Sequence, residues 1–199
     1  MLNIDKYIQN WNDILKNNSN LCDIALFKIY IQLEKYFTDT FYWYACGKKN
    51  ESGTYTPDRK LNFIDDTHLN SVLTSLTPRN HIDYLFTIGQ ISKHIFNINK
   101  DPFGVIFQDI NYNDVYIKVK SIRNYVAHES PEAKSKYIKS CLGNNKDKFE
   151  EPYKYLQRKN PITDTSNYDY YITRISEMCR ILDDPEPYFS NNSRMTNIQ

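Results

Sequence analysis

The chain has 199 residues, of which 40% are hydrophobic and 25% charged, and its formal net charge is +1. This composition is ordinary for a globular domain with its own core, and the balanced charge excludes a protein-wide basic field that would attract nucleic acid. Glycine is scarce, with 5 residues, and aromatic residues make up 15%, so long helices are favoured over a sheet with many hairpins.

Cysteine spacing and hydropathy narrow the protein class further. The four cysteines lie far apart in the sequence and form no CxxC pair, which argues against a zinc ribbon or a disulfide framework and indicates reduced thiols. The first residues contain no signal-peptide core, and no run of 18 apolar residues occurs. We therefore expect a cytoplasmic protein without a membrane span.

Apolar residues at helical spacing predict five helices before residue 113, at 4–16, 20–46, 66–76, 78–97 and 103–110. The second of them is apolar on most of its sides, which is typical of a central or interface helix. Its aromatic run at 41–44 is expected in the core or in a dimer contact, because base stacking on these rings would need positive charge beside them. The following loop, 47–60, is basic, which suits either plain solvation or a phosphate contact.

A longer helix is predicted to begin at Asn113, a good N-cap, with Asp114 in the first turn. Its apolar stripe consists of Val115, Val119, Ile122 and Val126, with Ile117 beside them. A further helix is predicted after Ser130, which suits the cap, with Pro131 at the first helical position and Gly143 at the stop.

Three polar side chains near the end of the first of these helices form the candidate site. Asn124 and His128 are four residues apart and share a face, and Arg123 is long enough to bring its guanidinium beside His128. Arginine binds phosphate through a bidentate fork, and histidine can transfer a proton near neutral pH. The pattern predicts a phosphodiester site, while plain capping or surface contacts are the alternative for such residues near a helix end.

Residues 123–128, RNYVAH, resemble the Arg-polar-x-x-x-His motif of HEPN domains, an all-helical family found in many prokaryotic RNase toxins and defence proteins. The residue after the arginine is commonly Asn, Asp or His in that family, and Asn124 fits. The helical pattern and the resemblance together predict an antiparallel all-α bundle of about six or seven helices. We expect it to form a single domain over residues 1–182, with an irregular stretch at 144–163, a final helix at 166–182 and a disordered tail at 183–199.

The resemblance implies metal-independent endoribonuclease activity in a homodimer, whose two motif helices face each other and build one composite cleft. His128 would act as general base or acid on the ribose 2′-hydroxyl or the leaving oxygen. Arg123 would bind the scissile phosphate, and Asn124 would orient His128 or the phosphate. The expected products are a 2′,3′-cyclic phosphate, or a 3′-phosphate, and a 5′-hydroxyl.

The resemblance also bears on partners. A toxin or phage-defence effector of this kind is expected to have an antitoxin or another regulatory protein. Some family members carry, two residues after the histidine, a tyrosine that a partner nucleotidyltransferase modifies. That position is Ser130 here, which does not support this form of control.

Lysines around the motif are candidates for a basic rim that binds RNA, although an ordinary solvated lysine face would have the same composition. They are Lys118, Lys120, Lys134, Lys136 and Lys139. No metal or other cofactor is assigned, because His68, His81 and His94 have no ligand spacing between them.

Two other interpretations stay open. The chain could be a catalytically inactive HEPN-like module that binds RNA or a protein. It could also be an unrelated helical interaction protein whose partner surface is the aromatic helix at 20–46. In both cases Arg123 and His128 would be dispensable for function.

Overall fold

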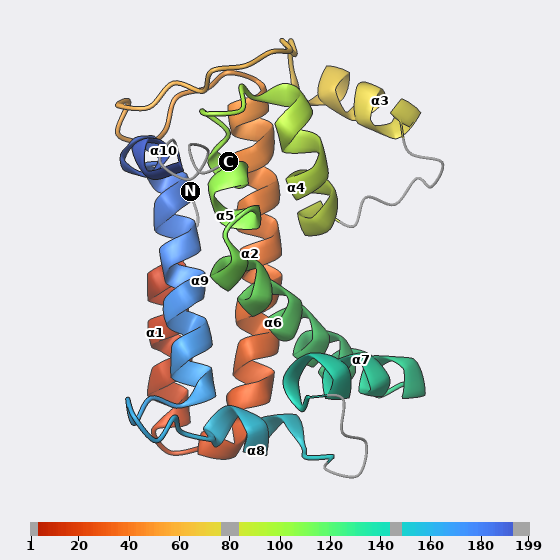
Figure 1. The fold of residues 1–199 in the computed structure, drawn as a ribbon, viewed down its shortest axis with the longest axis vertical. Helices are drawn as coiled ribbons and strands as arrows, with labels where there is room; N and C mark the ends of the chain where they lie inside the picture. The colour runs from red at the N-terminus through yellow and green to blue at the C-terminus, as the bar shows by residue number, and fades with distance from the viewer. Residues whose placement is uncertain (1–3, 77–83, 144–148, 193–199) are drawn as a thin grey trace, which may run out of the picture. The chain divides into compact units, whose positions relative to one another are not determined.

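The computed structural model of the chain describes residues 4–76, 84–143 and 149–192, in which helices are joined by irregular loops and no strand occurs beyond two isolated β-bridges (Figure 1). The predicted all-α class is confirmed. Ten α-helices are described, more than the six or seven predicted for the bundle and two more than the eight segments predicted individually. Two of them, α8 (Pro152–Gln157) and α10 (Glu186–Asn192), have 6 and 7 residues, too few for an apolar period to be visible in the sequence.

The chain divides into two compact units. One comprises Leu2–Leu33 and Ile110–Glu177 and contains RNYVAH, so we call it the motif unit. The other, which we call the aromatic unit, is built mainly from Glu34–Asp109 and Met178–Gln199. The single domain predicted for 1–182 stays a prediction.

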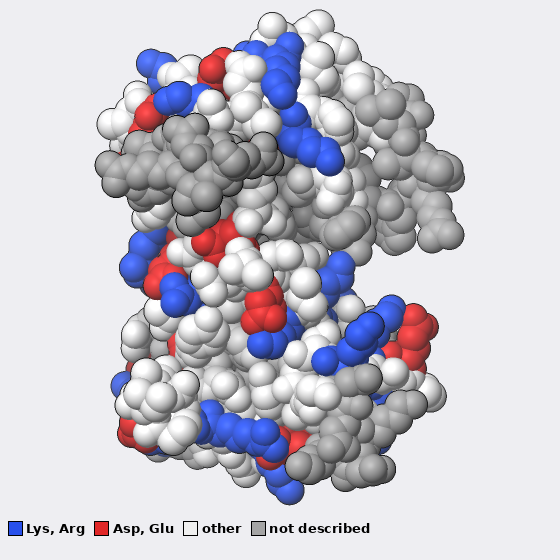
Figure 2. Space-filling model, viewed as in Figure 1, with Lys and Arg blue, Asp and Glu red and all other residues white. Residues whose placement is uncertain are grey.

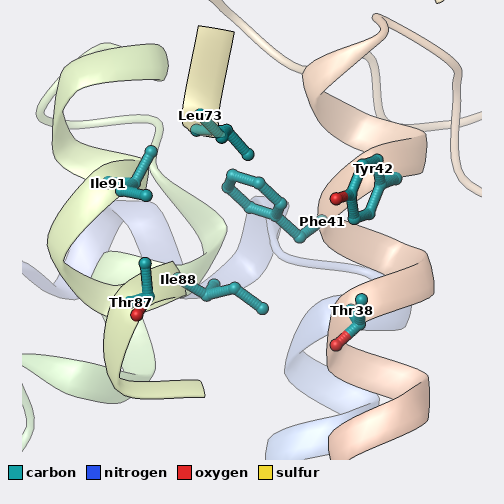
Figure 3. A pocket seen from close by; sticks show the side chains of 7 residues that line it. All are labelled: Thr38, Phe41, Tyr42, Leu73, Thr87, Ile88 and Ile91. Carbon is teal, nitrogen blue, oxygen red and sulfur yellow. The ribbon is translucent and has the colours of Figure 1, made fainter. Parts of the chain in front are cut away.

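The aromatic unit packs phenylalanine rings from several helices against the second half of α2 (Cys22–Ala45). The Phe41 ring lies 5.6 Å from that of Phe103 in α5 (Pro102–Phe107), centroid to centroid. Figure 3 shows Phe41 between Leu73 of α3 (Asp66–Leu76) and Ile88 of α4 (Tyr84–Ile95). The crevice they line, with Thr38, Tyr42, Thr87 and Ile91, holds only ≈ 10 Å³, so this contact is a packed core rather than a ligand site.

The aromatic run 41–44 is divided between the core and the surface. Phe41 and Tyr44 are buried, in line with the expected core role, whereas Trp43 is exposed. The Lys48 ammonium lies 4.6 Å from the centroid of the Trp43 ring, so the run does have positive charge beside it, contrary to the expectation from the sequence. Because Phe41 and Tyr44 are buried, only Trp43 and the half-buried Tyr42 of this run present ring surface to solvent.

The C-terminus of α2 is closed by Gly47 and Arg59. Gly47 has a φ of 77°, the left-handed conformation that favours glycine, and Arg59 Nη1 donates a hydrogen bond of 2.7 Å to the Ala45 carbonyl. A Cβ at position 47 would clash with the Arg59 guanidinium. The basic loop therefore contributes a structural contact through Arg59.

Gly47→Ala is expected to destabilise the protein more than Gly53→Ala. Both positions have a left-handed φ, but a Cβ at Gly53 would meet nothing within 4 Å. Each variant suffers the left-handed strain, about 1 kcal/mol, and Gly47→Ala additionally displaces the Arg59 guanidinium from its carbonyl, for roughly another 1 kcal/mol. Urea unfolding of the two variants measures the difference. Equal losses would mean that the Arg59 cap contributes nothing.

The predicted disordered tail is wrong for residues 186–192, which form α10. Phe189 is the reason: it is buried, with its ring 5.8 Å from that of Tyr55 and the Lys100 ammonium 5.1 Å from its centroid. One aromatic anchor in a polar segment gives no periodic signal in the sequence. Residues 193–199, the rest of the predicted tail, lie outside the described part of the chain.

In the motif unit, α1 (Ile4–Leu15) lies along α9 (Asn167–Asp183), as Figure 1 shows. The Tyr168 hydroxyl donates to Asn12 Oδ1 over 3.2 Å, and Ser176 Oγ contacts the Asp5 carboxylate. The bounds of α1 and α9 confirm the predicted helices at 4–16 and 166–182 to within a residue at each end. The start of the helix predicted at 78–97 falls partly outside the described residues, and α4 ends at Ile95.

The motif helix α6 (Ile110–His128) begins three residues before the predicted start, and the expected N-cap role of Asn113 is wrong. Asp114 instead forms a 2.7 Å ion pair with Lys118, one turn further along the helix. The following helix α7 (Pro131–Cys141) begins as predicted: Ala133 N donates to Ser130 Oγ over 3.2 Å. None of the helices in the described segments is both long enough and apolar enough to cross a membrane.

Candidate functional site

The buried side of α6 fixes the orientation of the motif. Val115, Val119 and Ile122 are almost completely buried, as their spacing predicts. Ile117, which the sequence placed beside this stripe, is 48% exposed. At 100° per residue it lies about 20° from Asn124 around the helix axis, so the outward face of α6 contains both.

The structure brings Arg123 and Asn124 together. Arg123 Nη1 donates to Asn124 Oδ1 over 2.9 Å, and the guanidinium carbon lies 5.8 Å from the centroid of the Tyr30 ring in α2. The Tyr30 ring in turn stacks on Tyr116, which lies about two turns before Arg123 in α6. The two ring centroids are 6.4 Å apart and the interplanar angle is 20°. These contacts hold a planar cation in a defined orientation, as bidentate phosphate binding requires.

His128 is the last residue of α6, and its side chain is exposed. It lies about 40° from Asn124 around the helix axis and one turn further along, so both belong to the same outward stripe. Glu129 follows in the left-handed conformation, with φ 47°, and its N–H donates to the Tyr125 carbonyl over 2.8 Å. The imidazole is therefore carried on a closed helix end, accessible to a ligand in solvent.

Exposed apolar residues extend this stripe toward the start of the helix. Ile110 is 80% exposed and lies about 40° from Asn124, and Ile117 lies between them. The spacing of seven residues from Ile110 to Ile117 and from Ile117 to Asn124 is that of a helix–helix seam. The candidate site thus adjoins an apolar strip on the same helix face.

The five predicted RNA-binding lysines have mixed surroundings. Lys118 pairs with Asp114 at 2.7 Å and Lys136 with Glu132 at 2.8 Å, both at i,i+4 spacing on exposed helix faces. Of the three others, two lie beside aromatic rings and one is exposed to solvent. Lys120 Nζ donates to the Tyr116 hydroxyl at 3.3 Å, Lys134 Nζ lies 3.8 Å from the centroid of the Phe149 ring, and Lys139 is exposed in the last turn of α7.

Figure 2 shows basic side chains (blue) and acidic side chains (red) close together over the α7 region. Two of the lysines therefore have a local carboxylate partner. The basic rim stays a prediction, with Lys120, Lys134 and Lys139 as its better candidates.

Aromatic residues that the sequence did not mark as functional surround the end of the motif. Tyr125 stacks on Tyr137 of α7, with ring centroids 5.6 Å apart and an interplanar angle of 3°. Both rings make T-shaped contacts with Phe149, at interplanar angles near 90°. Tyr30 lies in the predicted helix at 20–46, where the sequence indicates only that most sides of the helix are apolar. Which helix faces α6 is a long-range property, and no local pattern around residues 30 or 149 indicates it.

The thiol of Cys141, which contacts the motif helix, is not activated. Cys141 Sγ lies 3.5 Å from Ser121 Oγ between α6 and α7, and burial raises the pKa of Cys141 to about 11. It stays protonated at neutral pH and is a poor nucleophile. Among the residues that the structure describes, no three His, Cys, Asp or Glu side chains are grouped so that they could hold a metal ion.

Comparisons of the chain with protein-family models, with curated proteins and with solved structures gave no match. The resemblance of residues 123–128 to a known motif is therefore the basis for a functional assignment, together with the geometry of those residues.

Proposed function

We propose that the protein is a metal-independent endoribonuclease of the HEPN type, active as a homodimer in the cytoplasm, and that it serves as a toxin or phage-defence effector under the control of a regulatory protein. One observation carries the proposal: an oriented arginine, its asparagine partner and an accessible histidine lie within two turns at the end of one helix.

The proposed reaction uses the chain's own residues for charge and for proton transfer. His128 of one copy takes the proton of the ribose 2′-hydroxyl, whose oxygen attacks phosphorus while the bond to the 5′-oxygen breaks. A second His128 in the composite cleft protonates that leaving oxygen, so the products are a 2′,3′-cyclic phosphate and a 5′-hydroxyl. Arg123 offsets the extra negative charge on the phosphate in the transition state, and Asn124 holds the guanidinium plane.

The direct test is incubation of total RNA with the purified protein in EDTA, followed by analysis of the fragment ends. Cyclic phosphate ends are expected without any divalent ion. Intact RNA after prolonged incubation with a folded dimer, at several protein concentrations, would contradict the proposal.

The exposed strip of α6 supports the dimer. Ile110 and Ile117 stand on the same stripe as Asn124 and His128, so a second copy that covers the isoleucines would bring two motifs together. Burying such side chains contributes about 1.5–3 kcal/mol each.

Ile117→Glu is therefore expected to shift the protein from dimer to monomer and to abolish RNA cleavage. A carboxylate in a dehydrated seam costs several kcal/mol unless it is paired. Sedimentation velocity at micromolar concentration measures the oligomeric state. Ile162→Glu is the matched control, because Ile162 is 91% exposed and lies outside α6 in the same unit. A monomeric wild type, or the same shift in the control, would remove the support for the seam.

A second candidate function is a catalytically inactive HEPN-like module that binds RNA or a protein. The guanidinium of Arg123 already has an amide and an aromatic ring beside it, as in a purely structural contact. In that case Arg123 substitutions would lower stability, and RNA would stay intact with the wild type as well.

A further inference from the structure

An open hollow of ≈ 480 Å³ lies next to the α6–α7 hairpin in the motif unit. Its volume is within the range of roughly 300–1,000 Å³ that small-ligand sites occupy. The side chains that line it are Phe149, Glu150, Glu151, Lys154 and Arg158. An aromatic ring, two carboxylates and two cations thus meet in one place.

Phe149 links the hollow to the motif. Its ring packs at 83° against Tyr125, the neighbour of Asn124, with centroids 5.9 Å apart. The ammonium of Lys134, one of the candidate RNA-binding lysines, lies 3.8 Å from the Phe149 centroid. The ring is only half-buried, so it offers accessible aromatic surface beside positive charge. That combination is the one on which unpaired bases stack.

The rim of the hollow is held in place by its own contacts. The Tyr137 hydroxyl donates to the Glu150 carbonyl over 3.1 Å, and Arg158 Nη2 pairs with Glu150 Oε2 at 2.7 Å. Arg158 is therefore partly neutralised, whereas Glu151 is exposed at the edge. Lys154 supplies a second cation in the lining.

A carboxylate accepts hydrogen bonds at two oxygens and donates none. The base edge that matches it has two N–H donors side by side, and guanine presents these on its Watson–Crick edge through N1 and N2. Single-stranded RNA is commonly read by stacking on an aromatic ring and by hydrogen bonds to such an edge. We propose that the hollow binds one guanine nucleotide of an RNA substrate, stacked on Phe149, paired with Glu151 and with its phosphate beside Lys154.

This inference rests on the proposed function for its choice of RNA, but its test does not require cleavage. The probes are fluorescein-labelled 2′-O-methyl RNA hexamers of uridine with a single central guanine or adenine. They lack the nucleophilic 2′-hydroxyl, so binding is measured alone, by fluorescence anisotropy with the full chain.

The guanine hexamer is expected to bind roughly tenfold more tightly than the adenine hexamer. Phe149→Leu, which keeps the apolar contacts with Tyr125 and Tyr137, should weaken both probes by roughly tenfold through loss of stacking. Glu151→Gln should remove the preference for guanine and leave adenine binding unchanged. Glu132→Gln on α7 is the matched control for the loss of charge, and we expect no change in preference.

Equal affinity for the two hexamers, or a preference that survives Glu151→Gln, would overturn the inference. GMP alone should compete weakly, because the neighbouring phosphates of the strand are missing. Competition by GMP as strong as by the guanine hexamer would instead assign the hollow to a free nucleotide.

The nuclease proposal and the guanine-site proposal can be contradicted independently of each other. Cleavage by the wild type with no preference for guanine would leave the nuclease and remove the guanine site. Preferential guanine binding without any cleavage would leave the guanine site and remove the nuclease.

Discussion

Replacing His128 with alanine is expected to lower the rate of RNA cleavage by about 10²-fold or more while the protein keeps its fold. A lost general acid or base typically costs this much. The side chain is exposed at the end of α6 and packs into no core, so the free energy of unfolding should change by less than about 0.5 kcal/mol. Single-turnover cleavage of a labelled RNA in EDTA, with a urea unfolding curve for each variant, measures both.

The matched control is His94→Ala. His94 is also an exposed histidine in the last turn of a helix, but it belongs to α4 in the aromatic unit. We expect this variant to cleave like the wild type. Equal cleavage by wild type and His128→Ala would place the activity elsewhere and refute the assignment of the motif.

Arg123→Ala is expected to reduce cleavage by roughly 10²–10³-fold, the usual effect of removing a group that stabilises charge in the transition state. Arg123→Lys should recover little of this loss. Lysine keeps the charge but not the bidentate fork, and it lacks the planar guanidinium that lies 5.8 Å from the Tyr30 ring. Cleavage kinetics at saturating RNA separate the loss of rate from a loss of binding.

Arg123 also has structural contacts, so stability must be measured beside activity. Asn124→Asp distinguishes the two roles, because a carboxylate at this position would strengthen the bond to Arg123 Nη1 and neutralise the guanidinium. We expect unchanged or higher stability with lower cleavage. Full activity in Asn124→Asp would show that the positive charge of Arg123 is not used on phosphate.

Local signals in the sequence predicted the helices that place the motif. The valines at 115 and 119 mark the buried side of α6, and Ser130 with Pro131 marks the start of α7, because capping and period depend on near neighbours. The start of α6 was predicted too late, since a polar residue that suits a cap also suits the first turns of a helix. Asp114 and Lys118 show this, and their i,i+4 spacing was a visible signal for an ion pair.

The surroundings of the candidate site could not be predicted in the same way. The contact of Arg123 with Tyr30 joins two helices far apart in the sequence, and an apolar period says which side of a helix is buried but not which helix covers it. The burial of Phe189 depends likewise on Tyr55, on a distant loop. Tertiary pairing of this kind fixes the orientation of the guanidinium, whereas the residue types and spacing of RNYVAH are local.

The junction between α6 and α7 is short, and each of its residues has a structural role. Only Glu129 and Ser130 separate the two helices; the first closes α6 in a left-handed conformation and the second caps α7. One inserted residue would break the cap or turn α7 by about 100° relative to the imidazole. Sequence change at this point should therefore occur by substitution and not by insertion or deletion, and Glu129→Gly, which relieves the left-handed strain, should be among the tolerated substitutions.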